Sequence, residues 1–269
     1  MAQKNAPQEK NHIRTRPEYL SSCGQARRAY RDHYQDGCGV RAQTIDIRSF
    51  DSYLSRHAVR LSESQIRLLD LFLNELLEWN KSFNLVGLRS RHQVVRHLVL
   101  DSLICAAQLP EKGQLLDVGS GSGFPALPIK IYRPDLDLVL LEPNRKKASF
   151  LKHLKRTLSL EGFRVLRERL EAHVRSSKHP YHCVTSRAAM PAQKLLSSCA
   201  PILAPGGLIF LFLGKDAKVI LERSSKEIAQ ARLAIYRLQA YQLPAMAQPR
   251  FIAILKKTTD EALTSSMPS

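Results

Sequence analysis

Cysteines are few, and their spacing forms no structural site. The 269 residues include five of them, an odd number, and none belongs to a C-x-x-C pair. Disulfide frameworks and zinc sites need paired or regularly spaced cysteines, so neither is expected, and we predict no metal site. We interpret the cysteines as core residues of a protein in a reducing cytosol.

Long hydrophobic runs are missing as well. The longest, Leu208–Leu213, has the length of a strand, whereas a membrane span needs about 18 apolar residues. The N-terminal segment lacks the apolar stretch of a secretory signal, and its acidic residues argue against an organellar transit peptide: Glu9, Glu18, Asp32 and Asp36. By elimination, we predict a cytoplasmic protein with no membrane partner.

Acidic residues are scarce relative to basic ones. The chain has 41 Lys and Arg against 24 Asp and Glu, which gives a net charge of +17 and a pI near 9.9. Such an excess favours a polyanionic partner, and RNA, DNA and an anionic membrane surface are the candidates. The apolar fraction of 44% and the charged fraction of 24% exclude a wholly disordered chain.

The pattern along the chain divides it into a basic, disordered N-terminal extension (1–57), a small helical cap (58–110), a core (111–257) and a C-terminal tail (258–269). The extension has no sustained helical or strand period. In the cap, Ser62 and Gln65 have the spacing of a capping box, and apolar residues then recur at helical steps to about Asn80. A second helix is predicted from about Gln93 to Ala107.

The core has the pattern of an α/β fold. Continuous apolar strands alternate with helical segments, which is typical of a parallel sheet covered on both faces. The last two strands are joined without a helix, so they should pair antiparallel. We therefore predict a Rossmann-like sheet of seven strands, mostly parallel with one antiparallel strand. The predicted strands are Leu115–Val118, Leu136–Leu141, Arg164–Leu166, Cys183–Ser186, Leu208–Leu213, 232–241 and Phe251–Leu255, and the predicted helices are 125–132, 144–159, 191–203 and 216–231.

The first strand of the core runs into a glycine-rich loop. Gly119, Gly121 and Gly123 leave backbone that a ligand can approach closely. Asp117, two residues before the first glycine, disfavours a diphosphate but suits a ligand with an ammonium group, such as S-adenosylmethionine. Glu142 follows the last glycine by 19 residues, near the offset at which a carboxylate binds ribose hydroxyls. Together they indicate a class I methyltransferase that binds S-adenosylmethionine, and an NAD enzyme is the alternative.

On these residues, the chain resembles the ribosomal RNA small subunit methyltransferase G family (RsmG, also called GidB). The resemblance covers about residues 61–257. An ordered series of motifs carries it: Glu78-Trp79-Asn80-Lys81, Phe83-Asn84-Leu85, His97, Asp101-Ser102-Leu103, the loop from Asp117 to Pro125, Leu127-Pro128-Ile129, Lys146-Lys147, Phe150-Leu151 and Ser186-Arg187-Ala188.

The resemblance implies a function and a set of cofactor residues. Members of the family are cytoplasmic enzymes that move a methyl group from S-adenosylmethionine to N7 of a guanine in 16S rRNA. It implies that Gly119 and Phe124 contact the cofactor, that Leu170 and Glu171 lie beside its adenine, and that Arg187 completes the pocket. For Arg187, a structural ion pair with an acid such as Glu171 is the alternative.

Two positions depart from the family pattern. His97 and Asp101 are four residues apart, where the family usually has three, and a one-residue insertion could re-aim the helix that carries them. For this pair a hydrogen bond that packs the helix is favoured over a catalytic dyad. Leu213 stands where the family tends to carry Lys, and Lys215 is the candidate to replace it.

Basic residues near these motifs are candidates for contacts with RNA. Those predicted to bind the substrate are Arg96, His97, Arg145, Lys146, Lys147 and Lys215, and phosphate contacts are also predicted for Arg89, Arg91, Lys130 and Arg133. For any one of them, a solvated surface charge is the alternative.

The implied chemistry needs few catalytic groups. Guanine N7 has a lone pair and no proton, so its methylation requires no general base, and we predict no catalytic acid or base. The predicted partner is 16S rRNA or an assembly intermediate of the small ribosomal subunit, bound by a monomer. Two alternatives remain: a methyltransferase for another RNA position, and an RNA-binding assembly factor without activity.

Overall fold

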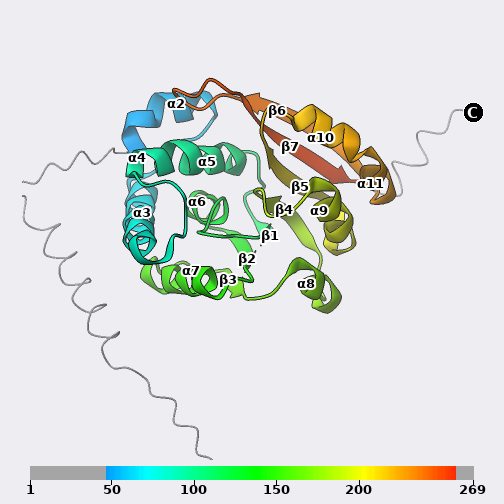
Figure 1. Ribbon diagram of the computed structural model, residues 1–269, viewed down its shortest axis with the longest axis horizontal. Coiled ribbons are helices and arrows are strands. Elements are labelled where there is room, and N and C mark those ends of the chain that lie inside the picture. The colour runs from blue at the N-terminus through cyan, green and yellow to red at the C-terminus, as the bar shows by residue number, and fades with distance from the viewer. Residues whose placement is uncertain (1–46, 259–269) are drawn as a thin grey trace, which may run out of the picture. The chain divides into compact units, whose positions relative to one another are not determined.

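The computed structural model describes residues 47–258, and their strands form one sheet in the order β3-β2-β1-β4-β5-β7-β6 (Figure 1). Strands β1 to β5 run parallel, and β7 pairs antiparallel with both of its neighbours. The predicted fold, with one antiparallel strand among seven, is confirmed. The strands are β1 (Gly113–Val118), β2 (Leu136–Leu141), β3 (Phe163–Leu166), β4 (Tyr181–Ser186), β5 (Leu203–Leu213), β6 (Leu233–Tyr241) and β7 (Arg250–Lys257).

Helices cover both faces of the sheet (Figure 1). One face packs against α8 (Leu170–Ser176), α9 (Ala192–Cys199), α10 (Ala217–Arg223) and α11 (Ser225–Gln230). The other packs against α2 (Asp51–Arg56), α3 (Glu63–Phe83), α4 (Arg91–Val94), α5 (Leu100–Ala106), α6 (Ala126–Tyr132) and α7 (Arg145–Thr157). Short turns complete the fold: η1 (Ile47–Phe50), η2 (Val95–Val99) and η3 (Ala200–Ile202). No helix within residues 47–258 has both the length and the apolar character that a membrane crossing requires.

The first long helix, α3, begins as its sequence predicts. Ser62 Oγ accepts a hydrogen bond from the Gln65 amide (3.3 Å), and Gln65 Oε1 accepts one from the Ser62 amide (2.9 Å), so both halves of the capping box are present. The helix continues to Phe83, a little beyond the predicted end, and stops at Asn84 in the left-handed conformation. Its Asn80 Oδ1 accepts a hydrogen bond from the Val86 amide, which holds the loop that follows.

The predicted N-terminal extension is too long at its C-terminal end. Residues 47–56 form η1 and α2, and Ile47 and Leu54 are each only 1% exposed in the core shared with the sheet. Their apolar residues recur at helical steps over about two turns, too short a stretch for the periodicity to stand out in the sequence. Residues 1–46 of the predicted extension, and 259–269 of the predicted tail, lie outside the described residues.

Two predicted helices are interrupted. The segment 216–231 is divided into α10 and α11 at Ser224, whose buried hydroxyl donates to the Ile220 carbonyl oxygen (2.7 Å) and so competes with the helical backbone. The segment from Gln93 to Ala107 contains the π-helical turn η2 between α4 and α5. Cys105, Cys183 and Cys199 are buried free thiols, as predicted, whereas Cys23 and Cys38 lie outside the described part of the chain.

Candidate functional site

A cleft of about 480 Å³ opens at the carboxyl ends of β1, β2 and β4, where open α/β sheets bind ligands. Of the residues predicted to bind the cofactor, Gly119, Gly121, Phe124, Glu142 and Arg187 line it, and the structure thus brings together residues from three separate strand ends. The other lining residues are Leu85, Val86, Leu98, Ser120, Ser122, Pro143, Lys147, Ala188 and Ala189.

The glycine loop has a conformation that side chains would prevent. Gly119 has φ +71°, and a Cβ atom there would lie 2.4 Å from the Ala189 Cβ. Gly121 has φ +56°, and a Cβ there would meet only the Gly119 carbonyl at 3.8 Å. Gly119 is therefore required by the packing of the loop against the segment after β4, whereas Gly121 has a left-handed backbone conformation that favours glycine.

The amides of this loop are used within the protein. The amides of Gly119 and Ser120 both donate to the Leu141 carbonyl oxygen at 3.0 Å. The Gly121 amide donates to Glu142 Oε2 (2.7 Å). A diphosphate would meet few free donors here and a carboxylate in their place, which argues against the NAD alternative.

Glu142 follows β2 and lies on one side of the cleft, 5% exposed. Its second oxygen, Oε1, accepts a hydrogen bond from the Asn144 amide (2.8 Å). Each carboxylate oxygen retains a lone pair, so Glu142 can still accept hydrogen bonds from a vicinal diol such as a ribose. The backbone bonds hold the carboxylate in place for that role.

Asp117 is fully buried at the base of the loop and does not line the cleft. Its Oδ1 accepts a hydrogen bond from Thr185 Oγ1 (2.7 Å), and its Oδ2 has no partner within the described residues. Burial raises the pKa of this carboxyl from 3.8 to about 6, so it is largely ionised at neutral pH. This buried negative charge lies next to the glycine loop and has no cationic side chain paired with it within the described residues.

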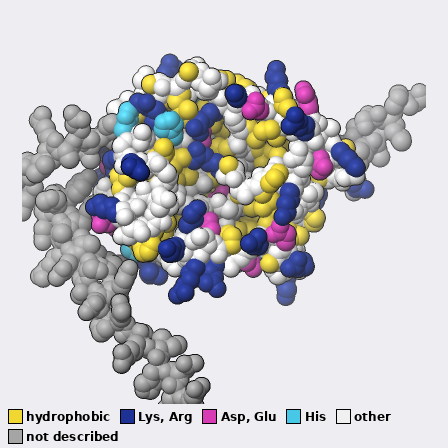
Figure 2. Space-filling view, in the orientation of Figure 1, with side chains coloured by type: hydrophobic (Ala, Val, Ile, Leu, Met, Phe, Trp, Pro, Cys, Tyr) yellow, Lys and Arg dark blue, Asp and Glu magenta, His cyan; other side chains and the backbone are white. Residues whose placement is uncertain are grey.

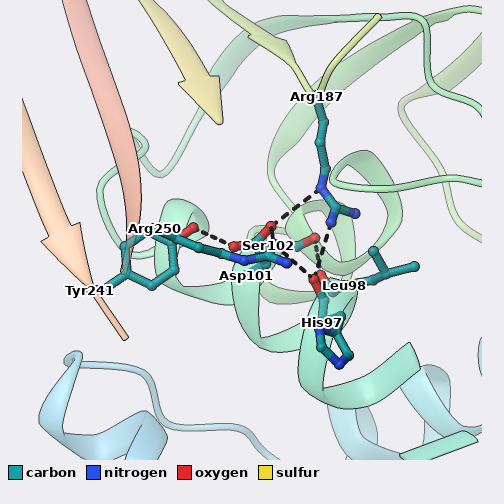
Figure 3. A network of polar contacts seen from close by, with 7 residues as sticks. All are labelled: His97, Leu98, Asp101, Ser102, Arg187, Tyr241 and Arg250. Atoms are coloured by element: carbon teal, nitrogen blue, oxygen red, sulfur yellow. Dashed lines mark hydrogen bonds and ion pairs between the residues drawn. The ribbon is translucent and has the colours of Figure 1, made fainter. Parts of the chain in front are cut away.

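Arg187 follows β4 on the other side of the cleft, and its contacts bear on both predictions made for it. Nε lies 3.3 Å from Asp101 Oδ2, and Nη2 donates to the His97 carbonyl oxygen at 3.2 Å (Figure 3). Glu171 instead pairs with Lys194 (2.5 Å). The predicted structural ion pair of Arg187 is therefore present, but its acid is Asp101 of α5 and not Glu171, and the same arginine also lines the cleft.

His97 lies in the π-helical turn η2, in which hydrogen bonds join residues five apart instead of four. Such a turn is consistent with the extra residue between His97 and Asp101 that the family resemblance implies. Asp101 faces Arg187, Arg250 and Tyr241, and no hydrogen bond within residues 47–258 joins it to the His97 ring. The predicted side-chain bond between His97 and Asp101 is wrong. It is the backbone carbonyl of His97 that takes part in the site.

Comparison with known proteins identifies the family of this chain. The family model of the rRNA small subunit methyltransferase G matches residues 65–246. The chain belongs to that family. A member from Thermotoga neapolitana is 35% identical over 76% of this chain and 88% of its own length, and one from Chloroflexus aggregans is 36% identical over 74% and 84%. Precorrin-6y C5,15-methyltransferase from Geobacter metallireducens aligns at 13% identity with a TM-score of 0.48, over 66% of this chain and 93% of that one.

The structure leaves four of the predicted cofactor residues of this family member outside the cleft lining: Asp117, Gly123, Leu170 and Glu171. Leu170, the first residue of α8, is 3% exposed and packs in the core. Conversely, Leu85 and Val86 line the cleft without having been predicted as site residues. Leu85 and Ala188 belong to motifs of the family resemblance, which could have indicated them, whereas Val86 and Ala189 belong to none of those motifs.

A second cavity of about 410 Å³ lies beside the first, between β5, α9 and α10, and shares Ala188 with it. Leu213, which stands where the family tends to have Lys, lines this second cavity together with Gly214. Lys215 is exposed in the turn that follows. The two cavities open from neighbouring strand ends.

The basic residues predicted to bind RNA separate into two groups. Arg145 and Lys146 are exposed at the start of α7, where Figure 2 shows Lys and Arg side chains gathered, and Lys147 lines the cleft. Lys146 Nζ lies 5.8 Å from the centre of the Phe83 ring. Arg96 and His97 lie half-buried in η2, and Arg96 Nη2 is 2.8 Å from His92 Nε2.

Three other cations have structural partners instead. Lys130 is 3% exposed, and its Nζ donates to the carbonyl oxygens of Pro134 and Leu136, each at 2.6 Å. Arg133 donates to the Ala106 carbonyl at the end of α5 (3.2 Å), and Arg91 pairs with Asp70. The predicted phosphate contacts of Lys130, Arg133 and Arg91 are therefore replaced by intramolecular bonds.

We expect Lys130→Ala to lower the free energy of unfolding by about 2 kcal/mol, because two charge-assisted hydrogen bonds are lost, one of them to a buried carbonyl. Its affinity for RNA should stay within about twofold of the wild type, because the side chain offers no charge to a phosphate. Denaturant unfolding and filter binding measure the two effects, with the exposed Lys112→Ala as control. Weaker RNA binding at unchanged stability would contradict the structural role.

Proposed function

We propose that this protein transfers a methyl group from S-adenosylmethionine to N7 of a guanine in 16S rRNA. The observation that carries the proposal is the cleft itself, in a chain of the rRNA small subunit methyltransferase G family. A carboxylate that can accept from a diol, Glu142, lies on one side, and an arginine, Arg187, lies on the other. The glycine loop between them offers little to a diphosphate.

Each end of the donor has residues suited to it. Glu142 would accept hydrogen bonds from the ribose hydroxyls, Phe124 and the backbone at Gly119 and Gly121 would pack against the nucleoside, and Arg187 would meet the amino-acid end. The ammonium group would lie near the buried negative charge of Asp117, whose Oδ2 has no partner within the described residues. Leu170 and Glu171 are proposed beside the adenine, as the family resemblance implies. When bound, S-adenosylmethionine supplies an electrophilic methyl group on a sulfonium.

The protein contributes position more than acid–base chemistry. Fixing the donor and guanine N7 in line can lower a barrier by about 7–11 kcal/mol in favourable cases. The apolar side chains Leu85, Val86 and Leu98 exclude water from one wall of the cleft. N7 lies in the deep groove of an RNA helix, which side chains cannot read, so the target guanine must be unpaired or turned out. We further propose that the enzyme acts in the cytoplasm as a monomer, on 16S rRNA or on an assembly intermediate.

The test is a nucleoside map of 16S rRNA from a deletion strain, by mass spectrometry. We expect one N7-methylguanosine to disappear and to return when the gene is restored. If every N7-methylguanosine were unchanged and another methylated nucleoside were lost, the enzyme would act at a different RNA position. Absence of saturable binding of S-adenosylmethionine at micromolar concentration would instead favour an inactive assembly factor.

The start of α7 gives a prediction for RNA binding. The double variant Arg145→Ala, Lys146→Ala should reduce the slope of log affinity against log salt by about 1.4, because each phosphate contact to a single strand contributes about 0.7. The matched control is Lys155→Ala, Arg156→Ala, exposed at the other end of the same helix. Equal slopes for both double variants would show that the start of α7 is not a phosphate site.

A further inference from the structure

The cleft is tied to the C-terminal strands by a buried polar network (Figure 3). Asp101, 1% exposed, receives two guanidinium groups on one oxygen: Oδ2 lies 3.3 Å from Arg187 Nε and 3.0 Å from Arg250 Nη1. Its other oxygen accepts a hydrogen bond from the Tyr241 hydroxyl. Arg250 is the first residue of β7 and Tyr241 the last of β6, so residues far apart in the sequence meet at one carboxylate.

The two arginines also share a second acceptor. The His97 carbonyl oxygen accepts from Arg187 Nη2 at 3.2 Å and from Arg250 Nη1 at 3.3 Å. This carbonyl belongs to the π-helical turn η2, whose wider winding leaves it available to side chains. The guanidinium groups are thus held side by side by two acceptors, of which only Asp101 is charged.

The charges in this network do not balance. Two guanidiniums face one carboxylate, and burial raises the pKa of Tyr241, which keeps its hydroxyl neutral. Burial and the neighbouring arginines lower the pKa of His97, so its ring adds little positive charge at neutral pH, and it does not supply a second negative charge. Burial and Arg250 also lower the pKa of Arg187, the direction expected of a cation that lacks a full counter-charge. One positive charge is left over, at the wall of the cleft that Arg187 lines.

We propose that Arg250 is a positioning residue for the donor: by sharing Asp101 it leaves Arg187 incompletely neutralised, and the free charge binds the α-carboxylate of S-adenosylmethionine. The proposal rests on the proposed function and extends it to a residue of β7, which lies beyond the segment matched by the family model. Arg187 is on the opposite side of β1 from Glu142, so a ligand with its ribose at Glu142 presents its amino-acid end here. The side chains of Arg187 and Arg250 are only 22% and 23% exposed, which suits a small carboxylate better than a phosphate within an RNA chain.

The experiment compares two ligands that differ only in the carboxylate. Binding of S-adenosylhomocysteine and of its decarboxylated form, S-adenosyl-3-thiopropylamine, is measured by calorimetry for the wild type and for Arg250→Gln, Arg250→Lys and Arg237→Gln. Arg237 is an exposed arginine of the neighbouring strand β6 and serves as the matched control. The ratio of the two affinities measures the carboxylate contact alone, and a general loss of structure would not change it.

We expect the wild type and Arg237→Gln to prefer the carboxylate form by roughly tenfold or more, the value of a charge-assisted contact, and Arg250→Gln to lose most of that preference. Arg250→Lys keeps the charge and should retain a larger preference than Arg250→Gln, and it provides the comparison if the glutamine variant does not fold. The proposal would be overturned if Arg250→Gln had the same ratio of the two affinities as the wild type. It would also be overturned if Arg250→Lys lost affinity for both ligands equally. Weaker RNA binding by Arg250→Gln with the carboxylate preference intact would overturn it as well, because the charge would then serve a phosphate. A wild type that bound neither ligand would refute the proposed function itself.

Discussion

Asp101→Ala should lower the free energy of unfolding by about 3–5 kcal/mol, because it leaves two mostly buried guanidinium groups without their common carboxylate. For a domain of this size that corresponds to a fall in melting temperature of roughly 10 °C. The Tyr241 hydroxyl also loses its acceptor, which adds to the cost. Denaturant unfolding followed by circular dichroism measures the effect.

The control for this substitution is Asp135→Ala, which removes an exposed carboxylate from the loop before β2. We expect it to change the free energy of unfolding by no more than about 0.5 kcal/mol. If Asp101→Ala were equally mild, the network would not be the buried ionic cluster that the distances indicate. The charge balance on which the role of Arg250 depends would then have to be given up.

Asp117→Asn should raise the free energy of unfolding and lower the affinity for S-adenosylmethionine. The pKa of the buried Asp117 carboxyl is raised from 3.8 to about 6, which corresponds to about 3 kcal/mol of unfavourable free energy once the group is ionised. Because the folded-state pKa is the higher one, the native state binds the proton more tightly, and this contribution to stability is present below pH 4 and lost as the pH rises through 6. The amide removes the penalty and can still accept from Thr185.

The stability gain of Asp117→Asn should therefore grow between pH 4 and pH 7, to at most about 3 kcal/mol, and then remain constant. At pH 7.5 its affinity for S-adenosylmethionine should be at least roughly tenfold below that of the wild type, since the ammonium group loses its counter-charge. Unfolding curves at several pH values and calorimetry test the two halves separately. A stability difference that does not vary with pH would show that Asp117 titrates normally, and unchanged affinity would remove it from the donor site.

The parallel sheet was predictable because most of its strands are short apolar runs bounded by turn residues. A continuous apolar run of that length is the pattern expected of a strand that is buried on both faces of a sheet. Leu136–Leu141 was predicted residue for residue. The split of α10 and α11 was not predictable, since it depends on whether the Ser224 hydroxyl bonds to the backbone or to solvent. The same holds for η2: a helix can take in an extra residue in several ways, and the sequence does not show that the His97 carbonyl oxygen accepts hydrogen bonds from Arg187 and Arg250.

The candidate site likewise has a part that could be predicted from the sequence and a part that could not. Gly119, Glu142 and Arg187 follow strands, so their meeting at one edge of the sheet follows from the topology once the strands are known. The contacts that those residues make with other side chains do not follow from the topology. Asp101, Tyr241 and Arg250 come from three elements far apart in the sequence, and no spacing rule connects them. Lys130 and Arg133 were predicted to contact phosphates but donate to backbone carbonyl oxygens instead. The sequence alone does not show whether a basic side chain has such an intramolecular partner.

A crystal structure with S-adenosylhomocysteine tests the central claim most directly. We predict the nucleoside in the cleft between Glu142 and Arg187, with the ribose hydroxyls within about 3 Å of the Glu142 carboxylate and the amino-acid carboxylate at the guanidinium of Arg187. A ligand bound in the reverse orientation, or in the cavity between α9 and α10, would contradict the account.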